Sequence, residues 1–123
     1  MSARVGWILS ALVIAFLIFD GGIKFFPIAP VTDSFNQLGY PVGLAPLIGG
    51  LELAITLLYA VPRTSLLGAI LLTGLLGGAI ASHLRIGSPL PTHTLFGAYL
   101  GAVAWGALYL REARLRALLP LRD

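Results

Sequence analysis

Cysteine is absent from this sequence of 123 residues. Disulfide bonds, thiolate catalysis, cysteine-ligated zinc and iron–sulfur clusters are therefore excluded. Charged residues are also scarce, at 11 % of the chain, whereas an ordinary globular domain has about a quarter. So few charges cannot solvate a water-facing surface, which argues against a soluble enzyme and against a nucleic-acid partner.

Apolar residues fill the place of the missing charges. They make up 58 % of the chain, and the mean hydropathy is +0.94. Four apolar stretches occupy residues 5–26, 42–61, 64–83 and 94–111, each near the ~20 residues that cross a bilayer as a helix. We expect the first stretch to be retained rather than cleaved as a signal peptide, because it lacks a clear small-x-small site. The sequence predicts an all-α integral membrane protein, a single four-helix bundle over residues 1–123.

The links between the stretches differ in kind. Residues 27–41 and 84–93 are rich in proline and turn formers, so we expect two loops that cover one mouth of the bundle. Pro62 and Arg63 form a tight turn, which makes the second and third helices antiparallel neighbours. The predicted topology is up-down-up-down.

The distribution of basic residues predicts the orientation. Lys24 and Arg85 fall on one side of the bundle. On the other side fall Arg4, Arg63, Arg111, Arg114, Arg116 and Arg122. Under the positive-inside rule, both termini lie in the cytoplasm and the two loops face outward from the inner (plasma) membrane. Residues 112–123 are interpreted as an amphipathic basic tail along the inner surface, or as a simple polybasic stop.

Small residues four apart indicate close helix packing, because helices in lipid associate through contact rather than through hydrophobic drive. Gly74, Gly78 and Ser82 form one such stripe, and Gly97 and Gly101 form another. These stripes either pack the bundle within one chain or, through Gly97 and Gly101, form the seam of a homodimer.

Glu52 is the strongest candidate for a functional residue. It lies midway along the second stretch, and an ionisable group at that depth is costly and faces a bundle interior or a wet cavity. Its helical stripe holds small and polar residues and should point inward: Ala45, Gly49, Glu52, Thr56 and Tyr59. The carboxyl either handles a proton or a ligand, or ties its helix to a neighbour.

Three further polar residues should reach the same level near the outward-facing mouth. Asp20 and Lys24 lie four apart on the first helix and can form an ion pair, although a lysine there can also simply snorkel to the surface. His83 ends the third helix, and its spacing of ten from His93 matches no common metal-ligand motif. We therefore predict an outward-facing pocket with charged walls, an apolar floor and no metal. Four aromatic residues are expected to line it: Phe16, Tyr40, Tyr59 and Tyr99.

Several of these residues resemble the motifs of the DoxX-like membrane protein family. Gly21-Gly22-x-Lys24, preceded by Arg4, is similar to the family's first-helix pattern, and Gly49-Gly50-Leu51-Glu52 to its Gly-x-x-Glu signature. Pro62-Arg63 resembles its short inner turn, and His83 a polar position near the end of its third helix. The resemblance implies a four-helix bundle of the inner membrane. Some members accompany sulfur or quinone oxidoreductases, and related proteins assist assembly of other membrane proteins. Redox chemistry at cysteines, found in some relatives, does not carry over, and Asp20 is not part of the pattern.

Three functions are consistent with these features. The first is an accessory or assembly subunit of a membrane oxidoreductase or other membrane protein, which binds a quinone or lipid through Glu52, Lys24, His83, Asp20, Tyr59 and Tyr99. The second is an enzyme in which Glu52 and Lys24 or His83 act as acid and base on a small apolar substrate. The third is a small proton-coupled transporter. The absence of a catalytic motif favours the first, so the chain is predicted not to act as a stand-alone enzyme.

Overall fold

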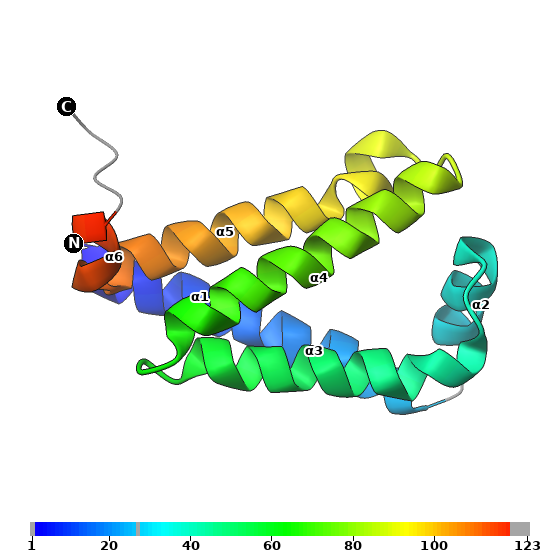
Figure 1. Cartoon of the computed structure of the whole chain (residues 1–123), viewed down its shortest axis with the longest axis horizontal. Helices are drawn as coiled ribbons and strands as arrows, with labels where there is room; N and C mark the ends of the chain where they lie inside the picture. The colour runs from blue at the N-terminus through cyan, green and yellow to red at the C-terminus, as the bar shows by residue number, and fades with distance from the viewer. Residues whose placement is uncertain (1, 27, 119–123) are drawn as a thin grey trace.

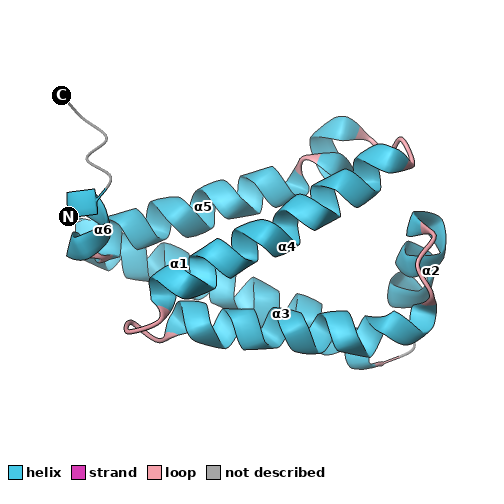
Figure 2. Cartoon of the chain, in the orientation of Figure 1, coloured by secondary structure: helices cyan, strands magenta, loops and turns pink. Residues whose placement is uncertain are grey.

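The chain is all-helical in the computed structural model, which describes residues 2–26 and 28–118. Figure 2 shows helices joined by short connections, with no strand among the residues described. The α-helices are α1 (Ser2–Gly22), α2 (Ala29–Leu38), α3 (Ala45–Ala60), α4 (Ser65–Arg85), α5 (Phe96–Arg111) and α6 (Ala113–Leu118). Short helical turns are η1 (Ile23–Phe25), η2 (Val42–Leu44) and η3 (Leu90–Thr94). The predicted all-α class is confirmed.

Four long helices run side by side and alternate in direction. In Figure 1, α1 leads away from the end where the chain begins, α3 returns, α4 leads away again and α5 comes back to α6. Helix α1 packs on α3 and α5, and α4 packs on the same two helices. The predicted tight turn at Pro62 and Arg63 joins α3 to α4, where the Ser65 hydroxyl donates a hydrogen bond to the carbonyl of Tyr59 at 2.8 Å.

Three helical segments of the described chain are long and apolar enough to cross a bilayer. They are Ala3–Phe25, Val42–Ala60 and Ser65–Arg85, with mean hydropathies of 2.0, 1.7 and 1.8. Large apolar side chains face outward along them, among them Phe19 and Leu57, each 65 % exposed. Such faces suit lipid, which solvates hydrocarbon as well as a protein core does. Helix α5 has 16 residues, or about 24 Å at the usual rise per residue.

Residues 27–41 are not the loop that their prolines predict, because most of them form helix α2. Pro30 stands in the first turn of α2, where a missing N–H breaks no helical bond. Gly39 ends the helix in the left-handed region at φ 79°. Val31 and Phe35, four apart, bury one face of α2 in a small cluster with Ala45 of α3. The second predicted loop begins later than expected, after Arg85, and contains the turn η3.

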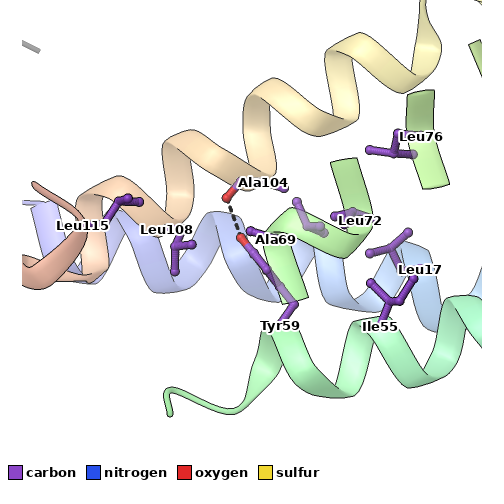
Figure 3. Close-up of a cluster of buried hydrophobic side chains, with 10 residues drawn as sticks. Leu17, Ile55, Tyr59, Ala69, Leu72, Leu76, Ala104, Leu108 and Leu115 are labelled. Carbon is purple, nitrogen blue, oxygen red and sulfur yellow. Dashed lines mark hydrogen bonds between the residues drawn. The ribbon is translucent and has the colours of Figure 1, made fainter. Parts of the chain in front are cut away.

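A buried core fills the half of the molecule nearer the chain start (Figure 3). Leu17 of α1, Ile55 of α3, Leu72 of α4 and Leu108 of α5 contribute to it. Tyr59 lies at its centre, fully buried, and its hydroxyl donates a hydrogen bond to the carbonyl of Ala104 at 2.6 Å. This core packs four helices together at one end of the molecule. Other contacts join the helices at the opposite end.

Arg111 ties the same helices together beside Tyr59. Its guanidinium donates to Ser10 Oγ at 2.7 Å and to the carbonyl of Tyr59 at 3.0 Å. It also stacks 4.2 Å from the centre of the Trp7 ring, a favourable cation–π contact. These contacts join α1, α3 and α5 through neutral groups and aromatic rings.

The basic tail begins with a break rather than a straight continuation of α5. The backbone at Glu112 is extended, and α6 follows it. The guanidinium of Arg114 donates to Glu112 Oε1 at 3.1 Å, and this hydrogen bond lowers the pKa of the carboxyl. Leu115 is the buried residue of α6 and joins the core. The rest of the predicted tail, residues 119–123, lies outside the described residues.

Candidate functional site

Lys24 lies between two carboxylates near the end of α1. Its Nζ is 2.7 Å from Asp20 Oδ2 and 3.0 Å from Glu52 Oε1. The same Nζ donates to the backbone carbonyl of Asp20 at 3.1 Å. The Glu52 side chain is only 5 % exposed, the Lys24 side chain 16 % and that of Asp20 37 %. We call these three residues the triad.

The triad joins α1 and the turn η1 that follows it to α3, and two glycines allow α1 and α3 to approach closely enough. A Cβ on Gly49 of α3 would lie 2.5 Å from the carbonyl oxygen of Gly21 and 2.8 Å from Lys24 Cβ. A Cβ on Gly21 would meet the Gly49 carbonyl at 3.2 Å. Neither contact tolerates a side chain without a shift of backbone. Because both positions are glycine, the two backbones lie close enough for the Lys24 side chain to reach Glu52.

The face of α3 that carries Glu52 points inward as its sequence stripe predicts. All five stripe residues, from Ala45 to Tyr59, are buried, together with Ile55. The Thr56 hydroxyl donates to the backbone carbonyl of Glu52 at 2.7 Å, so it adds no donor to the carboxylate. The carboxylate of Glu52 thus has Lys24 as its cation, and it does not face lipid.

A cavity of about 640 Å³ opens beside the triad, at the end of the molecule away from the chain start. This volume is typical of small-molecule sites. All three triad residues line it, and most of the remaining wall is apolar. The wall combines segments far apart in the sequence: Phe16 of α1, Phe35 of α2, Ile48 of α3, Leu75 of α4 and Leu100 of α5. The arrangement matches the predicted pocket of charged wall and apolar floor.

Helix α2 covers the cavity, and two contacts join its end to α4. The Tyr40 hydroxyl lies 2.6 Å from Ser82 Oγ, and Ser82 in turn donates to the carbonyl of Gly78 at 2.8 Å. Arg85 donates to the backbone carbonyl of Leu38. The far end of α2 is thereby attached to α4, while Val31 and Phe35 close the apolar side of the cavity.

His83 reaches the same cavity from α4, as predicted. Its Nδ1 lies 3.0 Å from Ser88 Oγ, and the residue lines the cavity together with Asp20, Lys24 and Glu52. The four polar residues singled out from three different helices are therefore brought to one cavity. Phe16 and Tyr40 line it too.

Tyr59 and Tyr99 lie outside the cavity, contrary to the expectation that they line it. Tyr59 points into the core beneath, toward Ala104, because its ring fills the space between helices below the triad. Tyr99 is 48 % exposed on the outer surface of α5. The helical stripe that placed Glu52 correctly thus continues past the depth at which the cavity ends.

Gly74 and Gly78 do not serve the close helix contact that their spacing predicts. An added Cβ on either would have no neighbour within 4 Å, and both residues line the cavity. Their missing side chains leave room rather than bring helices together. Gly97 does pack closely, since its Cβ would lie 3.1 Å from the Leu76 carbonyl oxygen within the same chain. A homodimer seam through Gly97 and Gly101 stays a prediction.

One part of the cavity, the side formed by α2, is not predicted by the sequence. Ser34 and Phe35 line it from α2, a helix that the prolines around it disguised. The apolar pair Val31 and Phe35, four apart, was the signal that could have revealed this helix.

Within residues 2–26 and 28–118, no group of three or more His, Asp and Glu side chains lies where it could hold a metal ion.

The site combines an apolar chamber with one compact charged cluster. With both carboxylates ionised, Asp20 and Glu52 carry two negative charges against the single positive charge of Lys24. In a low-dielectric wall that imbalance favours a proton or a polar donor as a third partner. The geometry therefore suits a molecule that is largely apolar and carries one polar end.

Comparison with known proteins identifies a family for this chain. The sequence model of the DoxX-like family matches residues 8–107, which include all three triad residues and His83. No significant match is found among curated proteins. The same holds for solved structures.

Proposed function

Because this chain belongs to the DoxX-like family of small membrane proteins, we propose that it is a membrane-embedded binding subunit whose cavity holds a quinone or lipid. Its role is that of an accessory or assembly subunit of a membrane oxidoreductase or other membrane protein. The observation that carries the proposal is the cavity of about 640 Å³ with apolar walls and the triad at one side. An amphiphile fits that division, with its tail along the apolar wall and its head at the triad.

The placement in the membrane follows the same proposal. Helices α1, α3, α4 and α5 form a four-helix transmembrane bundle, and α5 reaches across with the help of the turn η3 before it. The excess of basic residues at the end of the bundle that holds the termini supports a plasma (inner) membrane location with both termini in the cytoplasm. The cavity then opens toward the outer side, where α2 lies as a cover. The bilayer itself is the first partner of the exposed apolar faces.

Native mass spectrometry of gently extracted protein tests the binding role. Gly78→Leu fills the cavity without a backbone clash, since Gly78 lines it and faces open space. Gly77→Leu is the matched control, because Gly77 also has open space but lines the shallow groove on the outside of α4 and α5. We expect a bound non-protein mass on the wild type and on the control, and its loss in Gly78→Leu. Bare protein in all three samples would overturn the proposal.

A second candidate is an acid–base enzyme acting on a small apolar substrate. The contact of Lys24 with Glu52 favours it, since both groups project from their helices into one cavity rather than to opposite faces. General acid–base catalysis requires such groups within about 3 Å of the reacting atom. Turnover of a bound molecule by the wild type, lost in both Glu52→Gln and Lys24→Met, would favour this function over simple binding.

A further inference from the structure

We propose that the cavity selects a molecule whose polar head donates hydrogen bonds, such as a hydroxyl or a protonated amine, over a head that only accepts them or carries negative charge. This inference rests on the proposed binding function and specifies its ligand class. Within that function it favours the reduced, hydroxyl-bearing form of a quinone over the oxidised form.

The ammonium group of Lys24 has no N–H donor left for a ligand. An ammonium group has three N–H donors. Three acceptors lie within hydrogen-bond distance of Nζ: Asp20 O at 3.1 Å, Asp20 Oδ2 at 2.7 Å and Glu52 Oε1 at 3.0 Å. All three donors are therefore engaged inside the protein. An anionic or carbonyl head would have to break one of these bonds to bind the lysine.

The two carboxylates keep spare accepting capacity. A carboxylate accepts at about four positions, and each of these two shares one oxygen with Lys24. Their combined charge with Lys24 is minus one when both are ionised. In that state a head group that brings a hydrogen, or a positive charge, satisfies the spare oxygens and the charge together, whereas an anion is repelled.

Other polar groups also line the cavity. Ser82 gives its hydrogen to the carbonyl of Gly78, so the Tyr40 hydroxyl donates to Ser82 and retains an oxygen that accepts. His83 lines the cavity from α4, with Nδ1 3.0 Å from Ser88 Oγ, and Ser34 of α2 adds a hydroxyl that both donates and accepts. Helix α5 contributes apolar atoms through Phe96, Gly97 and Leu100. The excess of acceptors in this wall therefore comes from the two carboxylates of the triad, to which Tyr40 adds one accepting oxygen.

The test compares probes that share a tail and differ in the head. Decylhydroquinone, kept anaerobic, carries hydroxyl donors, and decylbenzoquinone carries only carbonyl acceptors. Decylamine and decanoate supply the two charges. Binding is measured by calorimetry with the protein in lipid nanodiscs, with empty nanodiscs and the cavity-filled Gly78→Leu protein as blanks. We expect decylhydroquinone to bind at least about tenfold more tightly than the quinone, and decylamine more tightly than decanoate, as one charge-assisted hydrogen bond allows.

Two variants connect that preference to the triad. Glu52→Gln and Asp20→Asn each remove one negative charge at nearly constant shape, and Asp20→Asn sits at the more exposed position, where folding is less at risk. Either should reduce the hydroquinone preference several-fold. Asp33→Asn removes a charge from an exposed site on α2 that does not line the cavity, and should leave the preference unchanged.

The outcomes separate this inference from the function on which it rests. If the quinone or decanoate binds as tightly as its partner probe, the donor rule is overturned while the binding function survives. A preference that persists in both triad variants also overturns it. If none of the four probes binds above the blanks, the binding function itself is overturned, and the donor rule with it.

Discussion

Gly49 of α3 lies directly against the backbone carbonyl of Gly21 of α1, so close that a methyl group there would come within 2.5 Å of that oxygen. This contact brings together the helices that carry Lys24 and Glu52. The ion pair across them is thus a consequence of backbone approach, and small residues on these two helices have a geometric role in the site.

Replacement of Gly49 by alanine should therefore push α1 from α3 and weaken the triad. We expect a loss of about 1–3 kcal/mol in the free energy of unfolding, the usual cost of an overpacked contact, and weaker ligand binding. Gly50→Ala is the matched control, because its Cβ would meet only Phe25 at an ordinary 3.7 Å. Denaturation of both variants in detergent checks this, and equal stability for the two would contradict it.

Substitution of Lys24 alone should lower the free energy of unfolding more than substitution of Lys24 and Glu52 together. Lys24→Met leaves Asp20 and Glu52 facing each other without a cation, and loss of one partner of a buried pair typically costs about 3–5 kcal/mol. Lys24→Met combined with Glu52→Gln should recover part of that stability. A double-mutant cycle in the unfolding free energy measures the coupling. As a control, Glu112→Gln removes the negative charge from the pair with the exposed Arg114 and should change stability far less than Lys24→Met does.

Arg111 should contribute strongly to stability although it has no role at the cavity. Arg111→Gln loses the stacking on Trp7 and the hydrogen bonds to Ser10 and the Tyr59 carbonyl. We expect a loss of about 2 kcal/mol or more. Unfolding followed by the fluorescence of Trp7 and Trp105 reports the change, with Arg63→Gln at an exposed position as control. Equal stability of the two variants would show that the arginine is not a structural tie.

The bond from Tyr40 to Ser82 should slow escape from the cavity. Tyr40→Phe keeps the ring but removes one of the two contacts that join the end of α2 to α4, at a cost of about 1 kcal/mol for one hydrogen bond, while Arg85 still binds the Leu38 carbonyl. Dissociation of decylhydroquinone, followed by stopped flow, should quicken several-fold. Tyr99→Phe removes a hydroxyl from the outer face of α5 and should leave the rate unchanged. If both variants release at the wild-type rate, α2 does not act as a cover.

The sequence predicts the long helices and the inward orientation of Glu52 well, because bilayer thickness fixes span length and a lone acid in an apolar stretch must turn inward. Asp20, Lys24, Glu52 and His83 line one cavity, and their placement there follows from the alternating directions of the helices. Their role in binding a ligand stays a prediction. To predict the position of these four residues, only the place of each along its helix and the face on which it lies were required.

The parts that failed depended on three-dimensional contacts that local patterns do not encode. Prolines flank α2 and pointed to a loop, while the burial of Val31 and Phe35 that stabilises the helix comes from α3. Gly74 and Gly78 share the spacing of packing glycines, yet the helices around them diverge and leave a cavity. Tyr59 lies on the correct face of α3 but below the floor of that cavity. Spacing identifies a face, whereas the distance between neighbouring helices decides what that face meets.

Photolabelling shows whether a bound amphiphile lies inside the cavity. A decylhydroquinone with a diazirine at the end of its tail is bound to the protein in nanodiscs, and the labelled residues are identified by mass spectrometry. We expect labels on the apolar wall of the cavity, at Leu75, Phe96 or Leu100, and we expect these labels to be lost in Gly78→Leu. Labels confined to lipid-facing positions such as Leu57 and Ile70, unchanged in that variant, would contradict this expectation.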